Sequence, residues 1–175
     1  MSFVTVYAIR PNGDAALLGE AKNNHGFAPL VWQKLMVQYG LHPTGSPYDL
    51  KPAWHYEPLW SLLGTGKLER SDELLLGITL DRAWIGRALV PELIKSMRAF
   101  HTRYIVPNNL VRTISDAADV LDGWLVECPD DRGVAFNMCS ACSSFWEVYD
   151  RETDESRNYN IDRDPGGPGR HWELT

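Results

Sequence analysis

The sequence predicts an α+β domain with a mostly antiparallel sheet and two to four helices packed on one face. Three features lead to this prediction: alternating apolar residues near the N-terminus, long stretches with helical spacing in the middle of the chain, and short strand-like segments separated by polar turns after Trp124. The chain has 175 residues, the usual length of one domain. We therefore expect a single domain over residues 1–164 and a flexible C-terminal tail over residues 165–175.

The first 40 residues predict a β-hairpin followed by a helix. Apolar residues alternate from Val4 to Ile9 and return over 15–21, and Asn12-Gly13 between these segments is a typical turn pair. Apolar residues then recur at helical spacing over 27–39. Gly40 follows at the place where a left-handed residue would cap the C-terminus of the helix.

The middle of the chain predicts an irregular connection, a central strand and two helices. Proline is frequent in residues 41–58, which favours a long loop with a short helix after it at 59–63. Leu74, Leu76, Ile78 and Leu80 lie at every second position, with Leu75, Gly77 and Thr79 between them, which predicts a central strand. Apolar stripes at helical spacing over 89–104 and 109–121 predict two amphipathic helices.

The last third of the chain predicts three strands. They cover residues 133–137, 144–150 and 157–161, and a polar turn at 152–155 joins the last two. Residues 164–169 read Asp-Pro-Gly-Gly-Pro-Gly, a composition that does not hold regular structure. We expect a loose tail to follow from this point.

Charge is divided unevenly along the chain. Residues 1–114 carry 12 Lys or Arg against 9 Asp or Glu, whereas residues 115–175 carry 5 against 14. A field of one sign attracts surfaces of the opposite sign, so this division bears on partners rather than on fold. It favours a small acidic protein that docks on a protein with a basic surface.

The leading hypothesis is a non-enzymatic interaction module of regulatory, inhibitor or immunity type. Its binding surface would lie in the acidic C-terminal third, with a tryptophan of the tail as an anchor. The candidate partner-binding residues are Asp150, Glu152, Asp154, Glu155 and Trp172. The competing interpretation is that this acidity only keeps the protein soluble.

The alternative hypothesis is an enzyme that uses zinc. Cys139 and Cys142 have the spacing of a metal-binding knuckle, and Cys128 lies eleven residues before them. Three thiolates and one histidine could complete a tetrahedral zinc site. A second knuckle is missing, however, so packing in the core competes with this interpretation.

A hydrolase built around a loop histidine is the other enzymatic alternative. His25 lies between Asn24 and Gly26, and His55 lies among aromatic residues close to Trp60. A histidine in an aromatic pocket can act as a general base near neutral pH. Residues 64–67 do not have the register of a phosphate-binding loop, and the acidic stretch after Asp150 does not have the pattern of an EF-hand.

Other classes of partner and location are less well supported by the sequence. Residues 82–112 are basic, but residues 115–131 are acidic, and two neighbouring helices of opposite charge would neutralise each other rather than bind nucleic acid. No apolar run reaches the ~20 residues of a membrane-spanning helix. The odd number of cysteines and the N-terminal composition lead us to expect a cytoplasmic protein. The sequence does not predict an oligomeric state.

Overall fold

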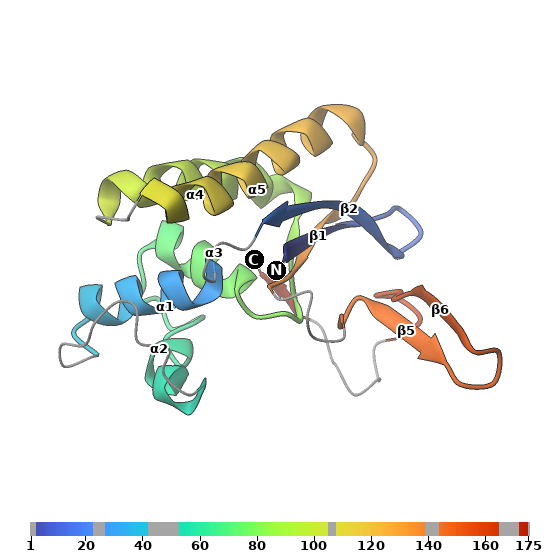
Figure 1. Cartoon of the computed structure of the whole chain (residues 1–175), viewed down its shortest axis with the longest axis horizontal. Helices are drawn as coiled ribbons and strands as arrows, with labels where there is room; N and C mark the ends of the chain where they lie inside the picture. Colours follow the sequence, from blue (N-terminus) through green and yellow to red (C-terminus); the bar gives the residue numbers. More distant parts are fainter. Residues whose placement is uncertain are drawn as a thin grey trace.

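The computed structural model contains a five-stranded sheet of order β2-β1-β4-β3-β7 and a separate two-stranded ribbon, β5-β6 (Figure 1). The structure describes residues 3–22, 27–41, 53–104, 108–138, 144–164 and 172–174. The strands are β1 (Phe3–Ile9), β2 (Ala15–Lys22), β3 (Ala83–Gly86), β4 (Gly133–Asn137), β5 (Glu147–Asp150), β6 (Glu155–Asn158) and β7 (Trp172–Leu174). The helices are α1 (Phe27–Gln38), α2 (Glu57–Trp60), α3 (Arg70–Ile78), α4 (Val90–Arg103) and α5 (Asn108–Glu127), with 3₁₀ turns η1 (Ala53–Tyr56) and η2 (Arg87–Leu89).

The predicted α+β class and mostly antiparallel sheet are confirmed. Within the described strands, the β3–β7 pair is parallel and the other pairs are antiparallel. The described residues form five α-helices, one more than the upper limit of the prediction.

The two faces of the large sheet bury different sets of residues. One face contributes Val6, Val134 and Phe136 to the main core with the helices. The opposite face buries Tyr7 and Trp84 in a second, smaller cluster with residues that flank the β5-β6 ribbon. Figure 1 shows the helices on one side of the sheet and the ribbon projecting on the other. The helices therefore leave the second face to the C-terminal part of the chain.

The elements expected in the first 40 residues are confirmed. Gly13 has φ +85° in the turn between β1 and β2, and Gly40 has φ +64° after α1. The Leu41 N–H donates to the Met36 carbonyl (2.9 Å) and the Gly40 N–H to the Val37 carbonyl (3.2 Å). These bonds form the Schellman arrangement that a glycine cap permits.

The strand predicted over residues 74–80 is wrong, because this segment forms the buried helix α3. Leu74, Leu75 and Leu76 are all nearly inaccessible to solvent, so burial on every side removed the periodicity that distinguishes helix from strand. Leucine is also a strong helix former. Acidic residues in the first turn of α3 add a favourable interaction with the helix dipole. The strand that does occur nearby, β3, is only four residues long and was not predicted.

The remaining boundaries differ in the loops and near the C-terminus. Residues 42–52 of the predicted irregular connection lie outside the described residues, and α2 begins two residues before the predicted short helix. Helix α5 continues six residues beyond the predicted end. The two strands of the ribbon, β5 and β6, are shorter than the strands predicted there, and Ile161 lies in a turn.

The C-terminal residues do not all behave as the sequence suggested. Residues 165–171 and 175 lie outside the described part of the chain, whereas residues 172–174 form β7. The expectation of a loose segment therefore does not hold for these three residues. Since β3 lies at the edge of the sheet without them, pairing with β3 satisfies backbone groups that a loose tail would expose to water.

Candidate interaction surface

The β5-β6 ribbon has a buried base. Trp146, immediately before β5, is 1% exposed, and its indole N–H donates to the Phe136 carbonyl (3.1 Å). Its ring packs edge-on against Tyr159, immediately after β6, with the ring centroids 5.9 Å apart. The Tyr159 carbonyl accepts the Ala15 N–H (2.7 Å), which ties the base to the first hairpin. The ribbon is therefore fixed to the sheet at one end.

Asn160 makes a second connection between this base and the first hairpin. Its side-chain amide donates to the Asn12 carbonyl (2.9 Å) and to Asp14 Oδ1 (2.7 Å). The hydrogen bond from Asn160 is the main reason why the pKa of Asp14 lies below its usual value. Asp164 Oδ2 accepts the Asn160 N–H (2.9 Å) and pairs with Arg157 (2.7 Å), which lowers the pKa of Asp164. The carboxylates of Asp14 and Asp164 thus help to hold the base of the ribbon against the first hairpin.

The other end of the ribbon is exposed and acidic. All residues from Tyr149 to Asn158 have exposed side chains. The sequence predicted Asp150, Glu152, Asp154 and Glu155 as partner-binding residues, and the structure brings all four together at and beside the turn of the hairpin. We call this group the hairpin tip.

Local hydrogen bonds shape the hairpin tip. Asp150 Oδ1 accepts the Glu152 N–H (2.8 Å), and Asp154 accepts the Tyr149 hydroxyl. This hydrogen bond to a carboxylate raises the pKa of Tyr149. Asp154 has φ +58°, a left-handed conformation that aspartate tolerates better than most residues. Among the described residues, no Lys or Arg lies within ion-pair distance of the four carboxylates.

Other acids of the C-terminal third are neutralised by arginines of the same chain. Arg98 on α4 pairs with Asp119 (2.9 Å) and with Asp122 on α5. Asp131 pairs with Arg10 (3.0 Å), and it also accepts the Trp124 indole N–H (2.8 Å). The α4–α5 pairs agree with the expectation that these two helices neutralise each other. Part of the negative charge counted in the C-terminal third is therefore neutralised within the chain and is not available to a partner.

Trp172, the fifth predicted partner-binding residue, lies away from the hairpin tip in sequence and sheet. It is the first residue of β7, where its backbone pairs with Ala83 of β3. Its side chain lies outside the described residues. The structure therefore does not bring Trp172 into the same element as the four carboxylates.

The zinc prediction rests on three cysteines, one of which is described. Cys128 is half-buried, and its sulfur accepts a hydrogen bond from Arg10 Nη1 at 3.7 Å. Cys139 and Cys142 lie outside the described residues. In the described part of the chain, no three His, Cys, Asp or Glu side chains gather as a metal site would require. The zinc site stays a prediction, and metal analysis of the purified chain tests it because three thiolates would retain zinc through dialysis.

Of the two histidines predicted as a general base, the structure describes one. His25 lies outside the described residues, whereas His55 is half-buried and packs edge-on against Tyr56, with ring centroids 5.5 Å apart. Tyr56 also packs against Trp32 and Trp60, at 5.0 and 6.4 Å between centroids. The aromatic cluster expected near His55 is thus present, and its contacts are those of core packing.

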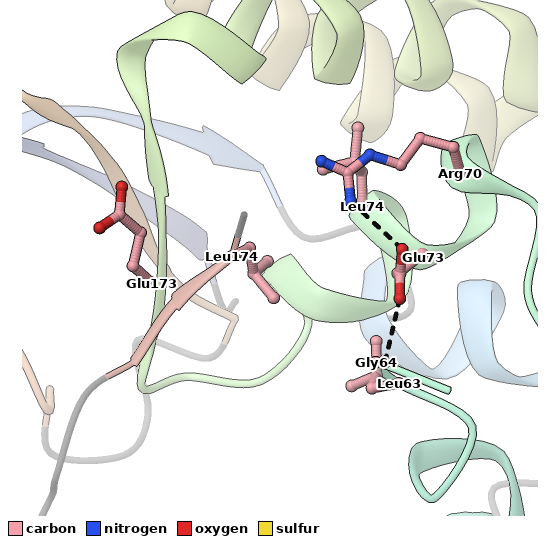
Figure 2. Close-up of a pocket in the computed structure, with 7 residues that line it drawn as sticks. All are labelled: Leu63, Gly64, Arg70, Glu73, Leu74, Glu173 and Leu174. Atoms are coloured by element: carbon pink, nitrogen blue, oxygen red, sulfur yellow. Dashed lines mark hydrogen bonds and ion pairs between the residues drawn. The ribbon is translucent and has the colours of Figure 1, made fainter. Parts of the chain in front are cut away.

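A small pocket lies between α3, the turn before it, and β7 (Figure 2). It has a volume of about 250 Å³, below the roughly 300–1,000 Å³ typical of sites for drug-sized ligands. Leu63, Leu74 and Leu174 form apolar parts of its wall. Glu73 accepts the Gly64 N–H (3.0 Å) and pairs with Arg70 (3.2 Å), so its carboxylate is fixed by two donors.

The sequence did not reveal a buried carboxylate in the first turn of α3. Asp72 is fully buried; its Oδ2 accepts the hydroxyls of Tyr39 (2.7 Å) and Tyr104 (2.9 Å), and its Oδ1 pairs with Arg103 (3.0 Å). Burial, followed by the hydrogen bond to Asp72, raises the pKa of Tyr39 to about 12, and the same causes raise the pKa of Tyr104. The partners lie more than 30 residues away along the chain, so no local motif could have indicated them.

Comparisons with known proteins supply no relative for this chain. No family model, no curated protein and no solved structure matches it. None of the described helices is long and apolar enough to cross a membrane.

Proposed function

We propose that this chain is a non-enzymatic interaction module that docks onto a basic protein through the hairpin tip. The observation that supports the proposal most directly is the combination of four exposed carboxylates, none within ion-pair distance of a described Lys or Arg, on a ribbon with a buried base. A small protein of this kind could serve as an inhibitor, a regulator or an immunity-type partner. We include a cytoplasmic location in the proposal, as the cysteine content suggests.

Electrostatics would act mainly on recognition and on the rate of association. Carboxylates close together on a projecting element give a local negative potential, which raises the rate of encounter with a basic surface. Tyr149, whose side chain is 57% exposed beside the tip, supplies apolar area of the kind that often contributes most to binding. Because the base of the ribbon is buried, little conformational order has to be gained on binding.

A pull-down from the native cell with a matched pair of variants tests the proposal. The test variant replaces the tip carboxylates by amides: Asp150→Asn, Glu152→Gln, Asp154→Asn and Glu155→Gln. The control variant removes four charges from exposed residues elsewhere: Glu57→Gln, Asp116→Asn, Glu127→Gln and Asp130→Asn. We expect the control to retain the captured partner and the test variant to lose it.

Kinetics with the captured partner make the test quantitative. The association rate should fall at least about tenfold from low to high salt for the natural sequence, because screening weakens steering between exposed charges. The test variant should show a slow rate at both salt concentrations. If the amide variant, shown to be folded by circular dichroism, captures the same partner at the same rate, the proposed surface is wrong.

A further inference from the structure

Strand β7 adds three residues to the edge of β3. Ala83, Trp84 and Ile85 pair in parallel with residues 172–174. Pairing with the edge of a sheet is a general way in which proteins bind extended peptides, since the backbone supplies hydrogen bonds and pockets select side chains. The β3–β7 pair therefore has the geometry of a bound peptide.

A glycine of α3 makes room for the side chain of Leu174. A Cβ atom at Gly77 would overlap the Leu174 side chain, and Gly77 is itself buried. Glycine inside a helix costs about 1 kcal/mol relative to alanine, so this position carries a cost that a closely packed neighbour explains. We call the space over Gly77 the leucine notch.

We use the word groove for the edge of β3 together with the leucine notch, the place that residues 172–174 occupy. A Cβ atom at Gly86 would lie 2.7 Å from Glu173 Oε1, so the neighbouring side chain of β7 lies over a second glycine. Both Glu173 and Leu174 contribute to the wall of the pocket of about 250 Å³. Figure 2 shows Leu174 directed toward α3 and Glu173 directed away from it. The groove thus distinguishes successive side chains of an extended segment.

The segment that occupies this groove follows a stretch rich in glycine and proline in the sequence. Residues 164–169 contain three glycines and two prolines, a composition without preference for helix or strand. Because the chain's own strand is covalently joined to the domain, it competes for the groove at an effective concentration on the order of millimolar. The same three residues of another molecule offer the same backbone groups and the same leucine.

We infer that the edge of β3 with the leucine notch is a peptide-binding groove that accepts residues 172–174 of a second copy in place of the chain's own. Each copy would donate its C-terminal strand to the other, which closes a symmetric pair without any new kind of contact. This inference uses a different surface from the hairpin tip and does not depend on the proposed function.

Binding of a synthetic peptide to the full-length chain tests the groove. The probe is a fluorescein-labelled peptide of residues 170–175, Arg-His-Trp-Glu-Leu-Thr, measured by fluorescence anisotropy. In the Leu174→Ala chain, the resident strand competes less well, so the apparent affinity for the peptide should rise about tenfold. A peptide with alanine in place of leucine should bind both chains more weakly. The four-amide variant of the hairpin tip should bind the peptide as the natural sequence does.

A second variant protects the test against an effect of Leu174→Ala on folding. Glu173→Pro removes a backbone N–H donor from β7 at a residue whose side chain is exposed. This variant weakens the resident strand, so it should also raise the apparent affinity of the chain for the peptide. Light scattering of the natural chain at concentrations up to millimolar then tests for exchange of strands between copies. We expect a dimer to form as the concentration rises and the free peptide to dissociate it.

Three results would overturn the inference. One is the absence of peptide binding to both variants, and another is equal binding of a scrambled peptide. The third is a chain that remains monomeric at millimolar concentration, which would exclude exchange between copies even if the peptide binds.

Discussion

The first turn of α3 and the hairpin tip are both acidic, yet their carboxylates have opposite surroundings. Asp72 in α3 is fully buried and engages two tyrosines and an arginine. The four carboxylates of the hairpin tip are exposed, and none has a described cationic partner within ion-pair distance. A count of charges along a chain therefore does not say which charges stabilise the fold and which are available to a partner.

The largest expected effect is that of removing the buried carboxylate. Asp72→Ala leaves the Arg103 guanidinium and two tyrosine hydroxyls without their shared acceptor, so we expect the free energy of unfolding to fall by about 3 kcal/mol. Urea denaturation followed by tryptophan fluorescence measures the change. Asp72→Asn, which keeps an acceptor oxygen, is the control and should cost less. A loss below about 1 kcal/mol would show that the network is not structural.

The next effect is a loss of stability at high pH. The pKa of Tyr39 and that of Tyr7 are both raised to about 12 in the fold, mainly by burial, whereas an unfolded tyrosine ionises near 10. The stability from these neutral phenols is complete below pH 10 and is lost as the pH rises toward 12. Denaturation at a series of pH values checks this direction. A stability that stays constant from pH 9 to about 12 would contradict the raised values.

A smaller effect is expected from one partner of Asp72. Tyr39→Phe removes the hydroxyl that donates to Asp72 and accepts the Glu69 N–H, while the ring remains. We expect a loss of about 1 kcal/mol, the usual net contribution of a hydrogen bond. The same variant should also show a weaker pH dependence above pH 10. Tyr149→Phe on the exposed ribbon is the matched control, and an equal loss in both variants would remove the distinction between the two regions.

The smallest effect on stability is expected at the hairpin tip. The four-amide variant should unfold at the same urea concentration as the natural sequence, within measurement error, because the tip carboxylates are exposed and form no ion pair with a described residue. Its loss of partner binding would then be a loss of recognition alone. A clear change in unfolding would show that these carboxylates also support the fold.

Several parts of the molecule could be predicted from neighbouring residues. The turn at Gly13 and the cap at Gly40 follow from local backbone requirements, and both glycines have positive φ. The amphipathic helix α4 follows from its apolar periodicity. The position of the hairpin tip was predicted for the same reason, since a polar turn between two strand-like segments is a local signal.

Prediction failed where burial on all sides removed the period. Leu74 to Ile78 are buried around the whole circumference of α3, so their sequence reads as apolar throughout and fits either a strand or a helix. Strand β3 is too short to show a period at all. Neither error could be corrected without knowledge of what packs around the segment.

The α+β class, the first hairpin, the helix that follows it and the acidic turn of the ribbon could be predicted from local sequence, because propensity, periodicity and turn chemistry act over a few neighbouring residues. The burial of Asp72 among Tyr39, Tyr104 and Arg103 and the packing of Leu174 over Gly77 result from tertiary contacts. These contacts join residues about 30 to 100 positions apart, and their energy depends on burial and distance, which arise when the whole chain packs.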